Sequence, residues 1–252
     1  MKILVLQKQS LTLFPTIFFR IQVGGIYMVI DWTEIDTVLL DMDGTLLDLH
    51  FDNFFWLRHL PDCYVEKFPG REKEALDDLK RQLFEKRGTL DWYCTDFWSQ
   101  QLDLDVVGLK KKIHHLISER PKSLLFLQAL NADNKQRILV TNAHPDSVAL
   151  KFSVTDIETE LDTVVSSHEY GFPKESLDFW RVLQQKCPFD PQKTLFIDDS
   201  ESVLDTAQRY GVANLLCVDS PDSTISAKNK SKYPSISHFE ELLSHNGELH
   251  YA

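Results

Sequence analysis

A short apolar segment, Thr37–Leu40, runs directly into two carboxylates, Asp41 and Asp43, and then into Gly44. In an open α/β sheet, ligands bind just beyond the carboxyl ends of the strands, so polar groups at this point are expected to belong to a site. Two carboxylates so close together repel each other unless a cation lies between them. The apolar strand and the lack of further acids at the required spacing argue against a calcium-binding loop. The segment therefore predicts a strand that delivers an acidic site.

Three later segments end in polar side chains in a comparable way. One apolar run closes on Thr141 and Asn142, another closes on Asp198 and Asp199, and Lys174 stands in a turn just before a helical pattern. Each segment alone has a structural interpretation, as a loop, a helix cap or a solvated surface lysine. Only the whole set in this order favours a catalytic role for these residues over a purely structural one.

Taken in order, Asp-x-Asp, Thr, Lys and Asp-Asp resemble the four motifs of the haloacid dehalogenase (HAD) superfamily of phosphohydrolases. On this interpretation Asp41 attacks phosphorus and forms an aspartyl-phosphate, the covalent strategy that a carboxylate allows. Asp43, two residues on and expected on the same strand face, protonates the leaving ester oxygen and then deprotonates the attacking water. This role requires a raised pKa for Asp43, and neighbouring carboxylates are expected to supply it.

The other motifs would bind the phosphoryl group. The Thr141 hydroxyl and the backbone amide of Asn142 are expected to donate hydrogen bonds to phosphoryl oxygens, and Lys174 to neutralise both the phosphate and the nucleophile. Together these groups supply positive charge and hydrogen-bond donors where phosphoryl transfer develops negative charge.

A magnesium ion is the expected cofactor, because Mg²⁺ retains several waters and favours carboxylate and phosphate ligands. It would lie between Asp41, the Asp43 backbone carbonyl and one acid of the later pair. The HAD resemblance implies Asp199 as the direct ligand, with Asp198 behind it. Many HAD members have an acid four residues past the metal-binding Asp, whereas this chain has Val203. The resemblance therefore leaves that supporting duty to Asp198.

The alternation of apolar runs with helical patterns predicts the fold class. The runs expected to be strands are residues 37–41, 137–141, 163–167, 194–198 and 214–218. Each is followed by a turn and a helical pattern, which indicates βαβ units and a Rossmann-like parallel α/β sheet. The interval between the first two runs instead carries helical periodicity with little strand character. It predicts an all-helical cap domain inserted after the first strand.

This organisation resembles the HAD subclass that carries a helical cap between the first two motifs. We expect the cap at residues 51–119 and the HAD core at residues 28–50 and 120–252, with hinges at 48–52 and 118–123. A cap that closes over the site excludes water and contributes substrate contacts. Substrate specificity is therefore expected to lie in the cap.

Aromatic residues gather in two segments of the expected cap. Phe55 follows the first motif, and Trp92 and Tyr93 lie in the segment Leu90–Trp98. Aromatic faces stack on planar bases, a contact worth about 1–3 kcal/mol in single-stranded nucleic acid binding. The alternative is that these rings form the hydrophobic core of the cap. Phe55, Trp92 and Tyr93 are the candidates to face a ligand, and at most one or two of them can do so.

Several segments together resemble the bacterial GMP/IMP nucleotidase group. They are Asp41–Trp56, Leu90–Cys94, Leu139–Pro145, Gly171–Lys174 and Leu195–Glu201. The cap segment Leu90–Cys94 is the specific one, because many unrelated activities share the core motifs. The resemblance implies magnesium-dependent hydrolysis of purine 5'-nucleoside monophosphates, GMP and IMP, in the cytoplasm.

Two other classes of function stay open. A sugar-phosphate phosphatase or phosphomutase of the same fold would keep the core motifs, and a mutase would use cap groups such as Arg58, His59, His114 and His115. A non-catalytic binding protein with the HAD fold would be expected to carry a broken motif, and none is broken here. Base preference and oligomeric state are not determined by these patterns.

Composition excludes several further classes. The 252 residues carry a net charge of -11 with no basic stretch to offset it, which argues against a nucleic acid polymer as partner. The sequence shows no glycine pattern typical of an ATP or dinucleotide site. The four cysteines have no zinc-binding spacing, so reduced thiols in a cytoplasmic protein are expected. The expected partner is a small phosphate ester, a nucleoside monophosphate.

The first residues are apolar, but Lys8, Pro15 and Arg20 interrupt them, which argues against a signal peptide or a membrane span. Family-like sequence begins near Met28. We therefore expect residues 1–27 to be an extension without regular structure or an upstream-start artefact, and we expect no membrane association.

Overall fold

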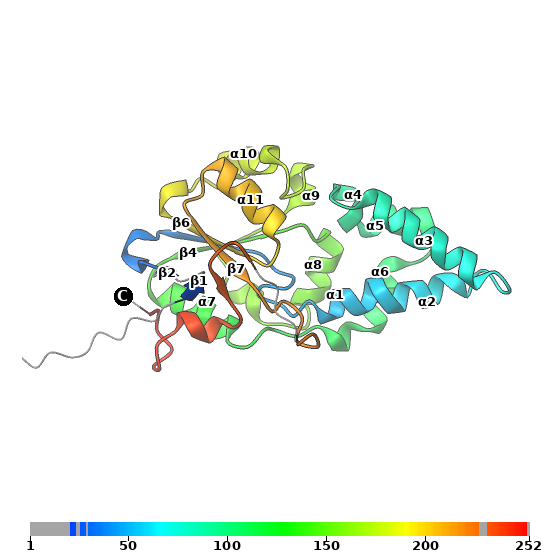
Figure 1. Ribbon diagram of the computed structural model, residues 1–252, viewed down its shortest axis with the longest axis horizontal. Helices are drawn as coiled ribbons and strands as arrows, with labels where there is room; N and C mark the ends of the chain where they lie inside the picture. The colour runs from blue at the N-terminus through cyan, green and yellow to red at the C-terminus, as the bar shows by residue number, and fades with distance from the viewer. Residues whose placement is uncertain (1–20, 24–25, 29, 227–230, 251–252) are drawn as a thin grey trace, which may run out of the picture.

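The computed structural model describes residues 21–23, 26–28, 30–226 and 231–250. An α/β core occupies one end of the molecule, and a lobe of helices projects from the other end (Figure 1). No helix within the described ranges combines the length and the apolar character needed to cross a bilayer.

A parallel sheet of six strands forms the centre of the core, in the order β5-β4-β3-β6-β7-β8. The strands are β3 (Thr37–Leu40), β4 (Gln136–Thr141), β5 (Thr163–Ser166), β6 (Thr194–Asp198), β7 (Asn214–Val218) and β8 (Ser235–Ile236). The chain builds one half of the sheet and then the other, so the winding reverses between β3 and β6. The crevice beyond the strand ends at such a reversal is where ligands bind in open α/β sheets. Leu40 is paired with Ile197, so the next residues, Asp41 and Asp198, lie side by side at this crevice.

The predicted parallel sheet is confirmed, and each of the five expected strands is present with ends within one residue of the expected bounds. The sequence patterns did not indicate β8, because a strand of 2 residues is too short to show periodicity.

Alternate side chains of each strand enter two hydrophobic layers, because successive residues of a strand point to opposite faces. Val38 and Leu40 lie in one layer with Phe126, whereas Leu39 lies in the other with Trp180. Helix α7 covers the first face, and α10 and α11 cover the second (Figure 1). The core helices are η1 (Trp32–Glu34), α7 (Ser123–Ala132), α8 (Pro145–Phe152), η4 (Ile157–Glu160), α9 (Ser167–Tyr170), α10 (Leu177–Lys186), η5 (Pro191–Lys193), α11 (Glu201–Tyr210) and η6 (Phe239–Leu242).

The lobe inserted after β3 is helical, and its helices enclose a hydrophobic cluster of their own. They are α1 (His50–Phe54), η2 (Phe55–His59), α2 (Leu60–Val65), α3 (Glu72–Lys86), α4 (Leu90–Tyr93), α5 (Thr95–Leu102), α6 (Val106–Lys112) and η3 (His114–Leu116). We call this helical lobe the cap, after the domain predicted at this place in the chain; its boundaries at residues 51 and 119 stay a prediction.

The two chain segments that connect the cap to the core run side by side. The Asp48 amide donates to the Ser118 carbonyl at 2.9 Å, and the Arg120 amide donates to the Leu46 carbonyl at 2.9 Å. These contacts lie within the predicted hinge segments or beside them. Movement of the cap as a rigid unit would have to bend both connections together.

Helices α1, η2 and α2 form one continuous rod with a π-helical turn in the middle. Pro61 explains the turn, because proline has no amide hydrogen to donate to the carbonyl four residues earlier. The widened turn carries Trp56 and Leu57, which face the pocket described below.

Two short strands precede the core. Ile21–Val23 (β1) pairs antiparallel with Ile26–Met28 (β2). This part of the expected extension therefore has regular structure, contrary to the expectation of an unstructured segment. Residues 1–20 lie outside the described residues.

Candidate active site

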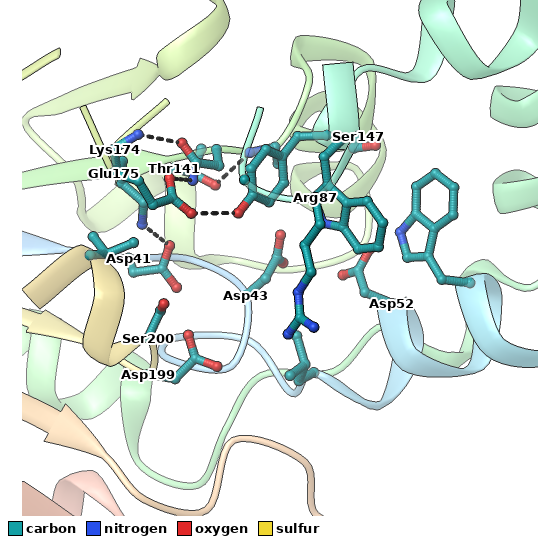
Figure 2. Close-up of a pocket in the computed structure, with 18 of the residues that line it drawn as sticks. Asp41, Asp43, Asp52, Arg87, Thr141, Ser147, Lys174, Glu175, Asp199 and Ser200 are labelled. Carbon is teal, nitrogen blue, oxygen red and sulfur yellow. Dashed lines mark hydrogen bonds and ion pairs between the residues drawn. The ribbon is translucent and has the colours of Figure 1, made fainter. Parts of the chain in front are cut away.

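A cavity of about 620 Å³ lies between the carboxyl edge of the sheet and the cap, and Figure 2 shows its lining. Its volume is in the range of about 300–1,000 Å³ that is typical of small-molecule sites. All the sequence-predicted site residues except Phe55 line it: Asp41, Asp43, Trp92, Tyr93, Thr141, Asn142, Lys174, Asp198 and Asp199. Segments up to about 160 residues apart in the chain thus meet in one cavity.

Lys174 connects the ends of β3 and β6. Its Nζ donates to Asp41 Oδ1 at 2.5 Å, to Asp198 Oδ2 at 2.7 Å and to the Val140 carbonyl at 3.2 Å. The lysine is only 2% exposed. Burial alone would lower its pKa, but Asp198 and Asp41 outweigh burial and raise the pKa above its usual range. The ammonium is therefore permanently charged at neutral pH.

Asp41 is nearly fully buried, and burial raises its pKa to about 6, against the opposing attraction of Lys174. The carboxylate is thus largely ionised at neutral pH, as a nucleophile must be. Its amide donates to the Ile197 carbonyl at 3.0 Å, which fixes the residue at the end of the sheet.

Three carboxylates converge here, since oxygens of Asp41, Asp198 and Asp199 all lie within 4.8 Å of one another. Among the described residues, Lys174 is the cation that contacts this cluster directly, through Asp41 and Asp198. Burial, followed by the repulsion of Asp198 and Asp41, raises the pKa of Asp199 well above its usual range. This uncompensated negative charge, held on hard oxygen donors, fits a divalent cation such as Mg²⁺. Both oxygens of Asp198 accept hydrogen bonds, one from Lys174 and one from the Ser200 amide, whereas Lys174 binds one oxygen of Asp41; Asp41 and Asp199 are therefore the better ligands.

Gly44 allows Asp199 to approach the first motif. The glycine has φ +87°, and a Cβ at this position would lie 2.6 Å from Asp199 Oδ2. Any side chain would therefore push the carboxylate away, in addition to straining the left-handed backbone.

Asp43 reaches the cavity from the turn beyond β3, because the strand itself ends at Leu40. The prediction that Asp43 lies on the same strand face as Asp41 is therefore wrong, although its side chain does line the cavity with Asp41. Burial is the main cause that raises the pKa of Asp43 to about 6. Lys151 opposes this shift, and the neighbouring carboxylates Asp52 and Asp41 add to it. The expected contribution of neighbouring carboxylates is thus present, but burial is the larger cause of the raised pKa.

Thr141 and Asn142 close strand β4 at the cavity. The Thr141 hydroxyl accepts from the Ala143 amide at 3.0 Å, which leaves its proton free to donate to a bound oxygen. The Asn142 side chain accepts from the Lys174 amide at 2.9 Å and donates to Glu175 at 2.9 Å. Asn142 thus holds the loop that carries the lysine in place.

A buried chain of charges that sequence analysis did not find links the core to the cap. Lys151 of α8 donates to Asp43 at 2.5 Å and to Asp52 at 2.6 Å, and Lys110 of α6 donates to Asp52 at 2.9 Å. Both lysines are at most 4% exposed. The two cations hold the pKa of Asp52 well below its usual range despite its burial. The alternating charges connect the cap directly to Asp43.

Two of the three cap candidates line the cavity. Trp92 stacks on Trp56 at a centroid distance of 6.5 Å and an interplanar angle of 17°. The Tyr93 hydroxyl donates to Glu175 at 2.9 Å, which joins cap and core. Phe55 is fully buried in the hydrophobic cluster of the cap and does not line the cavity. For Phe55 the structure favours the packing alternative, because its face of the rod turns inward.

Arg87 also enters the cavity from the cap, at the end of α3 (Figure 2). Among the described residues no ion pair is formed by its guanidinium, whereas Lys110 in the same wall is bound to Asp52. The groups considered for a mutase, Arg58, His59, His114 and His115, are not part of the lining.

Known proteins of similar sequence belong to the family that the four motifs resemble. The haloacid dehalogenase-like hydrolase family matches residues 35–211. The GMP/IMP nucleotidase YrfG of Escherichia coli (strain K12) is 41% identical over 214 residues, which is 85% of this chain and 96% of that protein.

Solved structures share the fold. A HAD phosphatase from Thermococcus onnurineus has a TM-score of 0.68 at 20% identity, covering 82% of this chain and 96% of that one. The HAD-hydrolase YfnB from Bacillus subtilis, solved bound to magnesium, has a TM-score of 0.58 at 19% identity, covering 82% of this chain and 96% of that one.

Proposed function

Because the chain belongs to the haloacid dehalogenase-like hydrolase family, we propose that this hydrolase is a magnesium-dependent phosphatase of purine 5'-nucleoside monophosphates, GMP and IMP. The observation that carries the proposal is the joint position of Asp41, Lys174 and Asp199 beneath a cavity whose other wall holds Trp92 and Arg87. A relative that is 41% identical over 96% of its length bears the name GMP/IMP nucleotidase.

The chemistry proceeds in two displacements. In the first, an Asp41 carboxylate oxygen forms a bond to phosphorus while the ester P–O bond breaks, and the leaving oxygen takes a proton from Asp43. In the second, Asp43 takes a proton from water, the water oxygen bonds to phosphorus, and the bond to Asp41 breaks. Free phosphate and the original enzyme result.

Lys174, Thr141 and the Asn142 amide hold the phosphoryl oxygens during both steps. They lie at the edge of the sheet, in a largely buried wall, where charge stabilisation is stronger than in water. Mg²⁺, held by Asp41, Asp199 and the Asp43 carbonyl, would neutralise phosphoryl charge when bound. Asp198 would support the site through its ion pair with Lys174.

The base would occupy the cap side of the cavity. Trp92, already stacked on Trp56, offers an aromatic face to a purine. GMP and IMP share an acceptor pair, O6 and N7, whereas AMP has an amino group in place of O6. An arginine guanidinium donates to O6 and N7 together. Arg87 is therefore the residue we assign to the preference for 6-oxopurines.

The cytoplasm is the proposed location, because the substrates are cytoplasmic metabolites and the four cysteines are free thiols.

A phosphate-release assay tests the proposal. The full-length protein and its Asp41→Asn variant would be assayed in Mg²⁺ with GMP, IMP, AMP, UMP and several sugar phosphates. We expect the highest kcat/KM for GMP and IMP, and no release by Asp41→Asn. Preference for a sugar phosphate would contradict the assignment of GMP and IMP as substrates, but the proposed reaction, hydrolysis of a phosphate ester, would still hold. If phosphate is released from none of these esters, the proposal that the protein is a phosphatase is contradicted.

A further inference from the structure

A second group of potential metal ligands lies at the junction of cap and core. Cys94, between α4 and α5 of the cap, lies beside His144 and His168 of the core, with one ligand atom of each within 4.8 Å of the others. The cluster is not part of the phosphate cavity, although Tyr93, which precedes Cys94, lines it. The proposed function uses none of these three side chains.

His168 has the arrangement of a metal-binding histidine. Its Nε2 is buried and has no hydrogen-bond partner among the described residues. The backbone of Asn142 lies beside the ring as an acceptor, and because Nε2 has no partner among the described residues this arrangement favours a proton on Nδ1. A neutral imidazole whose Nδ1–H donates to a carbonyl presents its Nε2 lone pair as metal-bound histidines do.

The other two members are arranged in a compatible way. The Cys94 sulfur accepts from the Phe97 amide at 3.4 Å at the N-terminus of the 8-residue helix α5. Partial positive charge there stabilises the negative charge of a metal-bound thiolate. The His144 ring packs edge-on against His168 at 5.0 Å. Its Nδ1 bonds to the Thr95 hydroxyl at 2.8 Å and accepts from the Asp146 amide at 3.4 Å, so an ion would bind at Nε2.

Nearby acids would offset the charge of a cation. Asp96 lies 3.7 Å from Nε2 of His144, and Asp146 lies 3.5 Å from its Nδ1. Both carboxylates are more than half exposed, so either can complete a coordination shell or leave that position to water.

We propose that Cys94, His144 and His168 bind a borderline divalent cation, Zn²⁺, at a site separate from the magnesium site. Thiolate and imidazole ligands select Zn²⁺ over Mg²⁺, whereas the carboxylates around Lys174 do the opposite. Because one ligand comes from the cap and two from the core, the bound ion ties the two together. Zn²⁺ therefore holds the cap closed and slows substrate entry and product release. The slowing of turnover rests on the proposed phosphatase function, whereas the binding does not.

Titration of the full-length, metal-free protein with Co²⁺ alone tests binding, because cobalt replaces zinc and reports its ligands by absorption. We expect a thiolate-to-cobalt charge-transfer band that saturates at one equivalent. Cys94→Ser should abolish the band, and His168→Gln should weaken binding by at least the ~10- to 100-fold that loss of an outer-shell partner costs. Asp199→Asn and Cys187→Ser, which alter the other acidic cluster and another half-buried thiol, should keep the band. No band, or an unchanged band in Cys94→Ser, would overturn the site.

Two further readouts separate this site from the proposed function. Zn²⁺ should raise the Tm of the wild type more than that of Cys94→Ser, whether or not the protein hydrolyses any ester. In saturating Mg²⁺, one equivalent of Zn²⁺ should reduce phosphate release by the wild type and leave Cys94→Ser unaffected. Equal inhibition of both proteins would overturn the coupling between this site and the cap.

Discussion

Lys151 Nζ lies 2.5 Å from Asp43 Oδ1, and the same ammonium lies 2.6 Å from Asp52 Oδ2 of the cap. A lysine of the core thus holds the proposed general acid and a cap carboxylate at once, at 1% exposure. If the cap opens, Lys151 must release Asp52 or move with it, and the environment of Asp43 changes. Closure of the cap and protonation of the leaving group are therefore expected to be coupled.

Lys151→Met should damage both stability and catalysis. Breaking a buried ion pair leaves an uncompensated charge and costs roughly 3–5 kcal/mol of unfolding free energy. Without its partner Asp43 also loses its orientation, so kcat should fall by about 100-fold, the lower end of what general acid–base catalysis contributes. Urea unfolding and phosphate release measure the two effects.

Lys193→Met is the matched control, because Lys193 pairs with Asp36 at 3.2 Å on the surface, where both side chains are about half exposed or more. It should cost less than about 1 kcal/mol and leave kcat unchanged. If Lys151→Met behaves like this control, the buried charge chain has no role in either property.

Gly44→Ala should impair the metal site specifically. The new Cβ would meet Asp199 Oδ2 at 2.6 Å, so the carboxylate must leave its present position in the acidic cluster. Gly70→Ala provides the control, because Gly70 has a similar φ of +80° and nothing within 4 Å of the added Cβ. In both variants the alanine must adopt a left-handed backbone conformation, which should lower the unfolding free energy by roughly 1–2 kcal/mol. Only Gly44→Ala should weaken Mg²⁺ binding in calorimetry, and equal affinity in the two variants would refute this explanation.

Stabilisation by Mg²⁺ should increase with pH. Burial raises the pKa of Asp41 and of Asp43 to about 6 and that of Asp199 well above its usual range, whereas an unfolded Asp has a pKa of about 3.9. Between about pH 4 and 6 these three carboxyl groups therefore hold more protons in the metal-free folded protein than in the unfolded chain, and their contribution to stability falls as the pH rises. Mg²⁺ needs the deprotonated carboxylates, so its effect grows over the same window.

Calorimetric melts in EDTA and in Mg²⁺, at about pH 5 and pH 7.5, measure this difference. At 100-fold excess over Kd the ion should contribute about 2.7 kcal/mol at the higher pH. Asp199→Asn should remove most of it. A magnesium-induced shift in Tm that is the same at both pH values would show that these carboxylates are not the ligands.

Arg87→Gln should change substrate preference rather than general activity. The variant loses the paired donors for O6 and N7, a contact worth about 1–3 kcal/mol of discrimination. The ratio of kcat/KM for GMP to that for AMP should fall accordingly, with little change for AMP. Arg58→Gln removes an exposed cap arginine outside the cavity and should leave the ratio as it is. An unchanged ratio in Arg87→Gln would remove this residue from base recognition.

Sequence predicts the core of the site well because each motif is local. A strand that ends in Asp41 and one that ends in Asp198 must meet at the same edge of a parallel sheet, whatever lies between them. The sheet and the position of Lys174 before a helix follow from the same short patterns.

The cap and its connection to the core depend on tertiary packing. Lys110 and Lys151 look like ordinary lysines of amphipathic helices, and their burial depends on Asp52 and Asp43, which lie 58 and 108 residues away from them in the chain. Phe55 and Trp56 are neighbours in sequence, yet one enters the cap core and the other faces the cavity, because the π-helical turn sets their directions. Cys94, His144 and His168 come from three separate segments of the chain, so the sequence contains no zinc-binding spacing that would predict their cluster.

Phosphorylation of Asp41 is the decisive observation for the proposed mechanism. Wild-type protein would be mixed with GMP and Mg²⁺, quenched in acid within the first turnover and analysed by peptide mass spectrometry, because Asp43 serves both steps and its loss would slow formation of the intermediate as well as its hydrolysis. We expect one added phosphoryl group on Asp41, and none in Asp41→Asn protein. A phosphoryl group on another residue, or turnover of GMP without any phosphorylated Asp41, would contradict it.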